Sequence, residues 1–206
     1  MQDPVQKSLY KNHNIKLRIK NMINIKGVDT RNKLIIFDLD DVLIKTDAKI
    51  KIVDRKTGKI IKSLTPQEFN TFESKPQKHV LDFGDFLNPE ILRQGKFIHE
   101  IFNKLKSYYK RGIPVAIVTA RSSSKLVRDF FLDNGIDIHP QLVIAISDPQ
   151  YDYKGTIADR KKEAIKDLID FGFKHLTFFD DSQENLTLAK EAEGYKGATI
   201  KLIKVD

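Results

Sequence analysis

Residues 33–43 read Lys-Leu-Ile-Ile-Phe-Asp-Leu-Asp-Asp-Val-Leu, a short apolar run that leads into a group of acidic residues. Buried strands of parallel sheets have this continuous apolar pattern, so we expect a central strand over residues 33–38. Open parallel sheets bind their ligands beyond the carboxyl ends of the strands. The acids that follow this strand, Asp38, Asp40 and Asp41, are therefore candidates for a functional site.

The chain alternates between helical and strand-like patterns from about residue 96 onward. The expected helices cover residues 97–109, 123–134, 159–171 and 183–193, and the expected strands cover 114–118, 142–146, 175–179 and 198–205. Strands that alternate with helices form a parallel sheet covered on both faces. We therefore predict an α/β fold of the Rossmann-like kind, with a central, mostly parallel sheet and helices on both faces.

The segment between the first strand and this alternating region has a different pattern. Two runs rich in β-formers, residues 50–53 and 59–64, flank Arg55-Lys56-Thr57-Gly58, which is a hairpin signal. Thr65-Pro66-Gln67-Glu68 then has the residues of a helix start. Residues 76–95 are expected to be irregular, and we predict a small inserted domain over about residues 44–95.

Polar residues follow three of the other strands of the predicted sheet. They are Thr119-Ala120-Arg121, Ser147-Asp148-Pro149 with a loop leading to Arg160-Lys161-Lys162, and Asp180-Asp181-Ser182. A parallel sheet would bring these groups together with Asp38. One edge of the sheet would then carry carboxylates, a hydroxyl and a lysine.

This combination of groups suits phosphoryl transfer. An aspartate can attack phosphorus and form an aspartyl-phosphate, and a second one can exchange protons with the leaving oxygen and the attacking water. Carboxylates hold Mg²⁺, which offsets the repulsion between the nucleophile and an anionic substrate. A lysine and a hydroxyl can bind the phosphoryl oxygens as charge redistributes.

Three stretches of the chain resemble motifs of the haloacid-dehalogenase-like (HAD) phosphohydrolase superfamily. They are Phe37-Asp38-Leu39-Asp40-Asp41-Val42-Leu43, Ile117-Val118-Thr119-Ala120-Arg121 and Phe178-Phe179-Asp180-Asp181-Ser182-Gln183-Glu184-Asn185. The resemblance covers roughly residues 33–203 in the order of the superfamily, and the lysine of its remaining motif falls at Lys161 or Lys162. Lys161 is favoured because it shares a helical stripe with Ala158, Ile165 and Leu168.

The resemblance implies a role for each of these residues. Asp38 would be the nucleophile, Asp40 the acid/base, and Asp38, Asp40, Asp180 and Asp181 would hold Mg²⁺, Asp40 through its backbone carbonyl. Thr119 and the lysine would bind the phosphoryl group, with Ala120 and Arg121 beside them as substrate-binding residues. Asp41 departs from the usual pattern of the superfamily, in which glycine follows the second aspartate.

The layout is also similar to the phosphatase domain of phage-type polynucleotide kinase/phosphatases. A small cap leaves the site open to sizeable substrates, so we expect nucleic-acid 3′-phosphate ends or nucleotides as substrates. The kinase motif G-x-x-x-x-G-K-[ST] does not occur in the sequence. The expected location is the cytoplasm, or the host cytoplasm or virion if the chain is phage-encoded.

Other interpretations of the acidic groups carry some weight. An isolated Asp-x-Asp pair is more often a turn or a helix cap, and Asp180-Asp181-Ser182 by itself could be an N-cap. A calcium loop would need an oxygen ligand at position 42 and glycine at 43, where the chain has Val42 and Leu43. A receiver domain of a response regulator has its acid pair first in the chain, whereas the pair Asp180-Asp181 comes last here.

Composition and charge narrow the class of protein. The 206 residues are 40% hydrophobic and 31% charged and include no cysteine, which excludes disulfides, thiol catalysis and Cys-ligated metals. The sequence has no apolar run of membrane-spanning length and no secretory signal pattern, so we expect no membrane partner.

The net charge of +8 is concentrated at the N-terminus. Residues 1–33 contain eight Lys and Arg against two Asp, and the other 173 residues contain 28 basic against 26 acidic residues. We predict a basic N-terminal arm over residues 1–32, with a phosphatase core over 33–206. The arm is either a solvated tail or a binding segment for nucleic acid or a protein assembly. If it is a binding segment, an alternative function for the chain is that of a structural or binding protein with a HAD fold.

Overall fold

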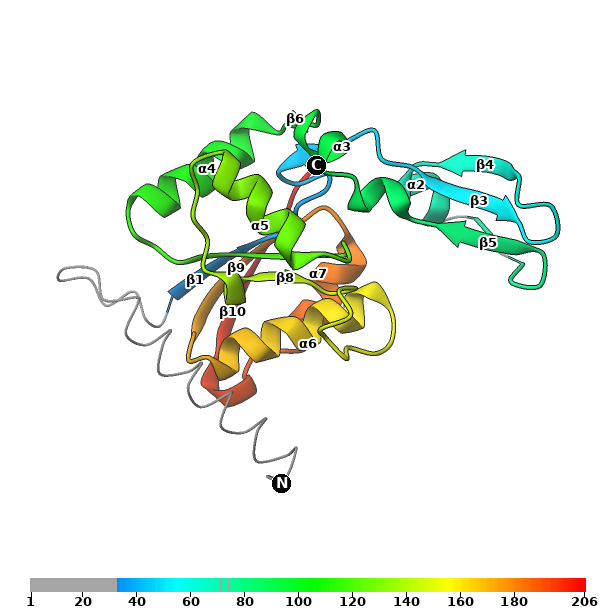
Figure 1. Cartoon of the computed structure of the whole chain (residues 1–206). Helices are drawn as coiled ribbons and strands as arrows, with labels where there is room; N and C mark the ends of the chain where they lie inside the picture. The colour runs from blue at the N-terminus through cyan, green and yellow to red at the C-terminus, as the bar shows by residue number, and fades with distance from the viewer. Residues whose placement is uncertain (1–32, 71, 74) are drawn as a thin grey trace, which may run out of the picture.

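Five parallel strands form the central sheet of the described residues, in the order β10-β9-β1-β7-β8 (Figure 1). The strands are β1 (Lys33–Phe37), β7 (Val115–Thr119), β8 (Val143–Ala145), β9 (His175–Asp180) and β10 (Thr199–Lys204). The computed structural model describes residues 33–206 apart from residues 71 and 74. The predicted basic arm over residues 1–32 lies outside the described residues.

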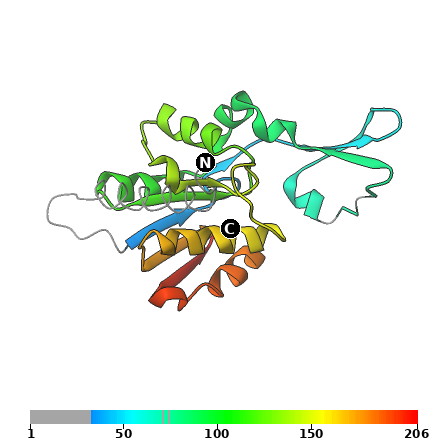
Figure 2. The ribbon, with the colours of Figure 1, turned by 60° about the horizontal axis from the view of Figure 1, so that its bottom comes forward.

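The connections between the strands place helices on both faces of the sheet. The chain runs from β1 through α4 to β7 and through α5 to β8, then returns through α6 to β9 beyond β1 and through α7 to β10. Right-handed crossovers therefore put α4 and α5 on one face and α6 and α7 on the other, as Figure 2 shows. These helices are α4 (His99–Lys110), α5 (Ser124–Asp133), α6 (Ile157–Asp170) and α7 (Gln183–Lys190).

This arrangement confirms the predicted α/β class and is compatible with a Rossmann-like fold. The sheet is parallel throughout, with Phe37 in register with Ile117 of β7 on one side and Phe179 of β9 on the other. The direction in which strands are added reverses between β1 and β9. Ligand sites of open α/β sheets lie at such a reversal.

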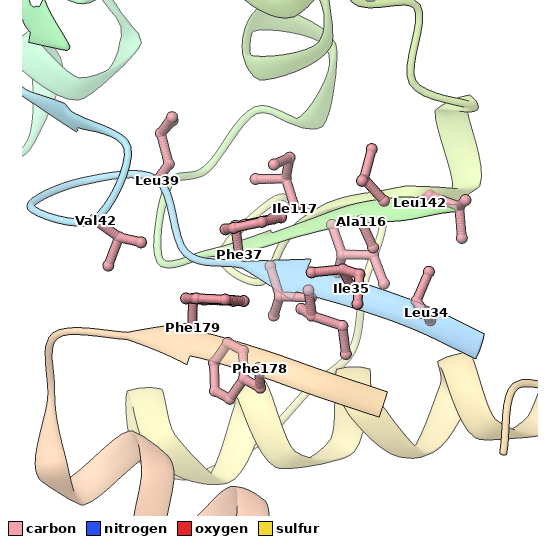
Figure 3. Close-up of a cluster of buried hydrophobic side chains, with 14 of the residues drawn as sticks. Leu34, Ile35, Phe37, Leu39, Val42, Ala116, Ile117, Leu142, Phe178 and Phe179 are labelled. Carbon is pink, nitrogen blue, oxygen red and sulfur yellow. The ribbon is translucent and has the colours of Figure 1, made fainter. Parts of the chain in front are cut away.

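The centre of the sheet is buried on both faces, which explains the apolar run with which the chain reaches Asp38. Residues 34–37 of β1 are at most 1% exposed. The rings of Phe37 and Phe179 stack with centroids 4.7 Å apart, and Leu39 and Val42 extend the cluster past the end of the strand (Figure 3). This packing fixes the backbone from which the acids at the end of β1 project.

A segment inserted between β2 (Ile44–Lys45) and β6 (Lys96–Phe97) extends away from the core (Figures 1 and 2). Strands β2 and β6 pair antiparallel, so the inserted segment, residues 46–95, leaves and re-enters the core at one place. Within it a three-stranded sheet, ordered β4-β3-β5, has its own small core of Ile50, Ile52 and Leu64. Its elements are β3 (Ile50–Asp54), β4 (Ile60–Leu64), α2 (Pro66–Asn70), β5 (His79–Asp82), the 3₁₀-helix η1 (Gly84–Leu87) and α3 (Pro89–Arg93).

The predicted hairpin and helix start of this segment are confirmed. The Thr65 N–H donates to Glu68 Oε2 at 2.8 Å, and the Glu68 N–H donates to Thr65 Oγ1 at 3.1 Å, which is a capping box. The expectation that residues 76–95 are irregular is wrong, because β5 adds to β3 and α3 begins at Pro89, directly after Asn88, whose side chain caps it. The pattern of β5 is too short and too polar to mark a strand without its partner β3.

No helix among the described residues is long and apolar enough to cross a membrane.

Candidate active site

The acids that follow β1 and end β9 meet around one lysine. Lys161 Nζ lies 2.9 Å from Asp38 Oδ2 and 2.8 Å from Asp180 Oδ2. All three residues are buried: Asp38 is 7% exposed, Lys161 1% and Asp180 0%. Burying three charged groups is costly unless they are paired. The register of β1 with β9, which sets Phe37 opposite Phe179, brings the two carboxylates together.

Helix α6 supplies the lysine, and its geometry separates the two candidates. Its buried stripe includes Ala158, Lys161, Ile165 and Leu168, which carries Lys161 toward the sheet. Lys162 lies one position round the helix and pairs with Glu191 at 2.8 Å and with Asp159 at 3.6 Å. The structure therefore brings Lys161 into the cluster and leaves Lys162 on the surface.

Asp180 is held by the start of α7, in a way that the sequence reasoning missed. The Ser182 N–H and Asn185 Nδ2 both donate to Asp180 Oδ1 at 2.9 Å, while Oδ2 faces Lys161. Asn185 is 7% exposed and positions Asp180 directly. A signal existed in the sequence, because an amide five residues after the aspartate lies in the first turn of a helix whose N-cap is Ser182.

The carboxylates form a group that fits a hard divalent cation. One oxygen each of Asp38, Asp180 and Asp181 lies within 4.8 Å of the others. Asp38 Oδ1 is buried, and it has no hydrogen-bond partner among the described residues. Buried polar atoms are normally satisfied, so an orphaned carboxylate oxygen in an all-oxygen cluster is an observation that favours a metal. The residues present thus fit the predicted Mg²⁺, with Asp38, Asp180 and Asp181 as candidate ligands.

The predicted group Thr119-Ala120-Arg121, at the end of β7, also lies at this edge of the sheet. Thr119 ends β7 with 1% exposure, and the Arg121 N–H donates to its Oγ1 at 3.4 Å, whereas Ala120 is exposed. The Arg121 side chain, predicted to bind substrate, forms a bidentate pair with Asp40: Nε donates to Oδ2 at 2.9 Å and Nη2 to Oδ1 at 2.8 Å. The Asp40 side chain is therefore engaged by Arg121, and a metal contact of its backbone carbonyl remains a prediction.

Two further acids have structural explanations. Asp41 has φ 58°, in the left-handed region that glycine adopts freely and aspartate tolerates better than most residues. Asp41 therefore occupies a backbone conformation that favours glycine. Asp148, which follows β8, accepts a hydrogen bond from the Ser124 N–H at 2.8 Å and so caps α5 instead of joining the cluster.

The environment shifts the pKa values of the cluster. Burial raises the pKa of Asp38 to about 7, against the opposing effect of Lys161 and with a further contribution from Asp180. Burial by itself would lower the pKa of Lys161, but the carboxylates of Asp38 and Asp180 outweigh it and raise that pKa. Burial and the charge of Asp180 also raise the pKa of Asp181. The carboxylates of the metal-free cluster thus carry more negative charge than Lys161 alone balances. A bound cation would reduce the repulsion between them.

We predict that the metal-free protein loses stability as the pH rises toward 7, through Asp38. Its pKa is about 7 in the folded protein and near 3.8 when unfolded, so between these values the folded state binds a proton that the unfolded state lacks. Raising the pH through this interval therefore lowers the free energy of unfolding, and Asp38→Asn removes this contribution. Urea denaturation of both proteins in EDTA at pH 5 and pH 8 measures the difference. A gap between the two proteins that is the same at both pH values would contradict the assignment.

No protein-family model matches the chain, and the comparison with curated proteins found no match either.

Proposed function

We propose that this chain is a Mg²⁺-dependent phosphomonoesterase of the HAD type, acting through an aspartyl-phosphate on Asp38. The observation that carries the proposal is the buried cluster of Asp38, Lys161 and Asp180, in which one oxygen of Asp38 has no partner among the described residues. Such a cluster is expensive to bury. A role in binding an anionic group and a cation accounts for it, whereas a purely structural or binding protein would not need it.

The proposed reaction has two steps. Asp38 attacks phosphorus as the bond to the leaving oxygen breaks, and Asp40 gives that oxygen a proton. Asp40 then takes a proton from water, which attacks the aspartyl-phosphate, releases phosphate and regenerates Asp38. Lys161 and Thr119 bind the oxygens of the transferred group, and Asn185 keeps Asp180 in place. Mg²⁺ held by Asp38, Asp180 and Asp181 would supply positive charge that offsets the repulsion between nucleophile and substrate.

The proposed substrates are nucleic-acid 3′-phosphate ends or nucleotides. The resemblance to phage-type phosphatase domains supports this choice, as does the charge of the inserted hairpin, whose residues 50–64 include five Lys and Arg against one Asp. A cytoplasmic location and a binding role for the arm over residues 1–32 are part of the same proposal. A panel of nucleotides and of 3′- and 5′-phosphorylated oligonucleotides would rank the substrates.

Hydrolysis of p-nitrophenyl phosphate tests the proposed reaction. We expect turnover with Mg²⁺, loss of turnover in EDTA, and recovery when Mg²⁺ is added back. Ca²⁺ serves as a matched control, because its larger radius and flexible coordination suit the site less well. A purified, folded chain that releases no p-nitrophenol with Mg²⁺ at any pH between 5 and 9 would refute the proposal.

A further inference from the structure

Arg121 is a buried charged residue whose side chain donates hydrogen bonds to Asp40 and to the inserted segment. Two of its nitrogen atoms, Nε and Nη2, donate to the two oxygens of Asp40 at 2.9 and 2.8 Å. The side chain of Arg121 is 1% exposed and that of Asp40 is 23% exposed. Bidentate pairs of this kind fix the orientation of the carboxylate as well as its charge. Asp40 is therefore held in one orientation and remains partly exposed.

The remaining terminal nitrogen of Arg121 reaches the inserted segment. Nη1 donates to the backbone carbonyl of Phe86 in η1 at 2.9 Å, and the guanidinium lies over the Phe86 ring, 5.5 Å from its centroid. Asp85, the neighbour of Phe86, accepts hydrogen bonds from the Lys49 N–H at 3.1 Å and from Lys51 Nζ at 2.6 Å. Arg121 thus connects Asp40 to η1, and η1 is tied in turn to β3 of the projecting sheet.

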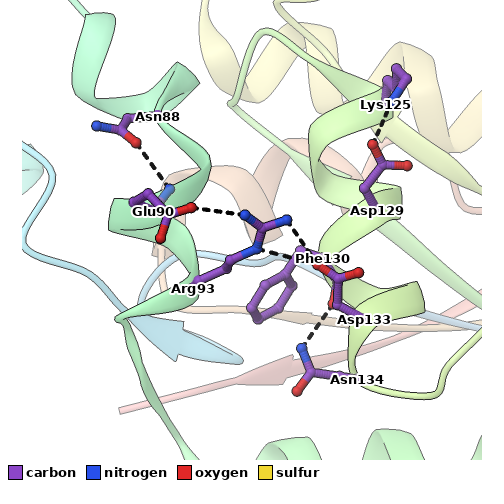
Figure 4. Close-up of polar contacts among 8 residues, drawn as sticks. All are labelled: Asn88, Glu90, Arg93, Lys125, Asp129, Phe130, Asp133 and Asn134. Atoms are coloured by element: carbon purple, nitrogen blue, oxygen red, sulfur yellow. Dashed lines mark hydrogen bonds and ion pairs between the residues drawn. The ribbon is translucent and has the colours of Figure 1, made fainter.

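A second link between the inserted segment and the core is weaker. Arg93 of α3 pairs with Asp133 of α5 at 3.1 Å and with Glu90 at 2.8 Å (Figure 4). The side chains of Arg93 and Asp133 are both half-exposed, and exposed pairs of this kind contribute little. Of these two polar links, the buried contact of Arg121 is therefore the one better able to transmit the position of the inserted segment to the site.

We propose that Arg121 is a positioning residue, which holds the Asp40 carboxylate for proton transfer and makes its position depend on η1. This inference rests on the proposed function. When Asp40 gives its proton to the leaving oxygen, negative charge appears on the carboxylate, and the Arg121 fork balances it without moving. Three of the five N–H groups of Arg121 donate to Asp40 and Phe86, so we assign Arg121 to Asp40 rather than to the transferred phosphoryl group.

The leaving group distinguishes the two roles of Arg121. p-Nitrophenolate departs without a proton, whereas the alkoxide of glycerol 2-phosphate needs one from Asp40. The quantity to compare is kcat/KM, which covers the chemistry only up to transfer of the phosphoryl group to Asp38. For Arg121→Gln we expect kcat/KM to fall about 100-fold more for glycerol 2-phosphate than for p-nitrophenyl phosphate. Inhibition by inorganic phosphate should be unchanged.

Three further variants complete the test. Arg121→Lys keeps the charge but not the fork, so it should recover only part of the kcat/KM for glycerol 2-phosphate that Arg121→Gln loses. Phe86→Leu removes the ring under the guanidinium. It should lower the ratio of kcat/KM for glycerol 2-phosphate to kcat/KM for p-nitrophenyl phosphate, by a smaller factor than Arg121→Gln does. Arg93→Gln, the matched control at the exposed link, should leave the ratio unchanged. The ratio of two kcat/KM values does not depend on the fraction of folded enzyme, so partial misfolding cannot imitate the result.

Several results would overturn the inference. Equal losses on both substrates, with weaker inhibition by phosphate, would make Arg121 a phosphoryl-binding residue. A selective loss for Arg121→Gln together with an unchanged ratio for Phe86→Leu would overturn the dependence on η1. Wild-type protein that hydrolyses neither substrate would refute the proposed function itself, which separates that failure from the failure of the role of Arg121.

Discussion

Replacing Asp38 with asparagine should lower kcat for p-nitrophenyl phosphate by about 10⁴-fold or more, because an amide of the same shape cannot attack phosphorus. The same change should not destabilise the metal-free protein at pH 8. Asp38 is a buried carboxylate next to Asp180, and burial together with that neighbour disfavours its charge. A neutral side chain removes this cost and can still accept the hydrogen bond from Lys161. The measurements are steady-state kinetics with Mg²⁺ and thermal denaturation in EDTA.

The control for this variant is Asp133→Asn, the same chemical change at a half-exposed carboxylate on α5. Its activity should equal that of the wild type. Asp40→Asn should also be severely impaired, and because hydrolysis then lacks its base, phosphoenzyme on Asp38 should accumulate. Residual activity of Asp38→Asn above a few per cent of wild type would exclude Asp38 as the nucleophile.

Replacing Lys161 with methionine should destabilise the metal-free protein by about 3–5 kcal/mol at pH 8, because it leaves Asp38 and Asp180 buried without their cation. The loss should be smaller at pH 5, because Asp38, whose pKa is about 7, then binds a proton. Activity should fall about 100-fold or more, since the variant lacks a charge that binds the transferred group. Urea denaturation at the two pH values and kinetics with Mg²⁺ measure these effects.

Lys162 provides the matched control on the same helix. Lys162→Met removes an ion pair with Glu191, whose carboxylate is largely exposed, so the free energy of unfolding should change by less than about 1 kcal/mol and activity should be retained. If the two variants lost activity equally, the assignment of Lys161 to the site would be wrong. Equal loss of stability would show that the cluster around Lys161 does not contribute as described.

The central sheet could be predicted from sequence because its strands are buried on both faces. Residues 34–37 and 115–118 are uninterrupted apolar runs, and each is followed by polar residues at the edge where ligands bind. The helices were visible because their apolar residues recur with helical spacing, and the stripe on α6 also favoured Lys161 over Lys162. Local sequence patterns were therefore sufficient to predict most of the fold and the residues of the acidic cluster.

The parts that sequence did not reveal depend on contacts between distant segments. Strand β5 pairs with β3 across about two dozen residues, and its own four residues, His-Val-Leu-Asp, carry no distinctive pattern. Arg121 is 81 residues from Asp40 and 35 from Phe86, so nothing near it in the sequence indicates that its fork is occupied. The same holds for the missing partner of Asp38 Oδ1, which only three-dimensional packing defines.

The pairing of β2 with β6 has a consequence for how such a chain can evolve. Both ends of the segment over residues 46–95 meet at one antiparallel pair, so this stretch of gene can be lengthened, shortened or exchanged while the central sheet stays in place. New specificities can therefore be sampled without rebuilding the groups around Lys161. One restriction applies to every exchange: the incoming segment must present a carbonyl oxygen where Phe86 presents one now, or Arg121 loses a partner in a buried position.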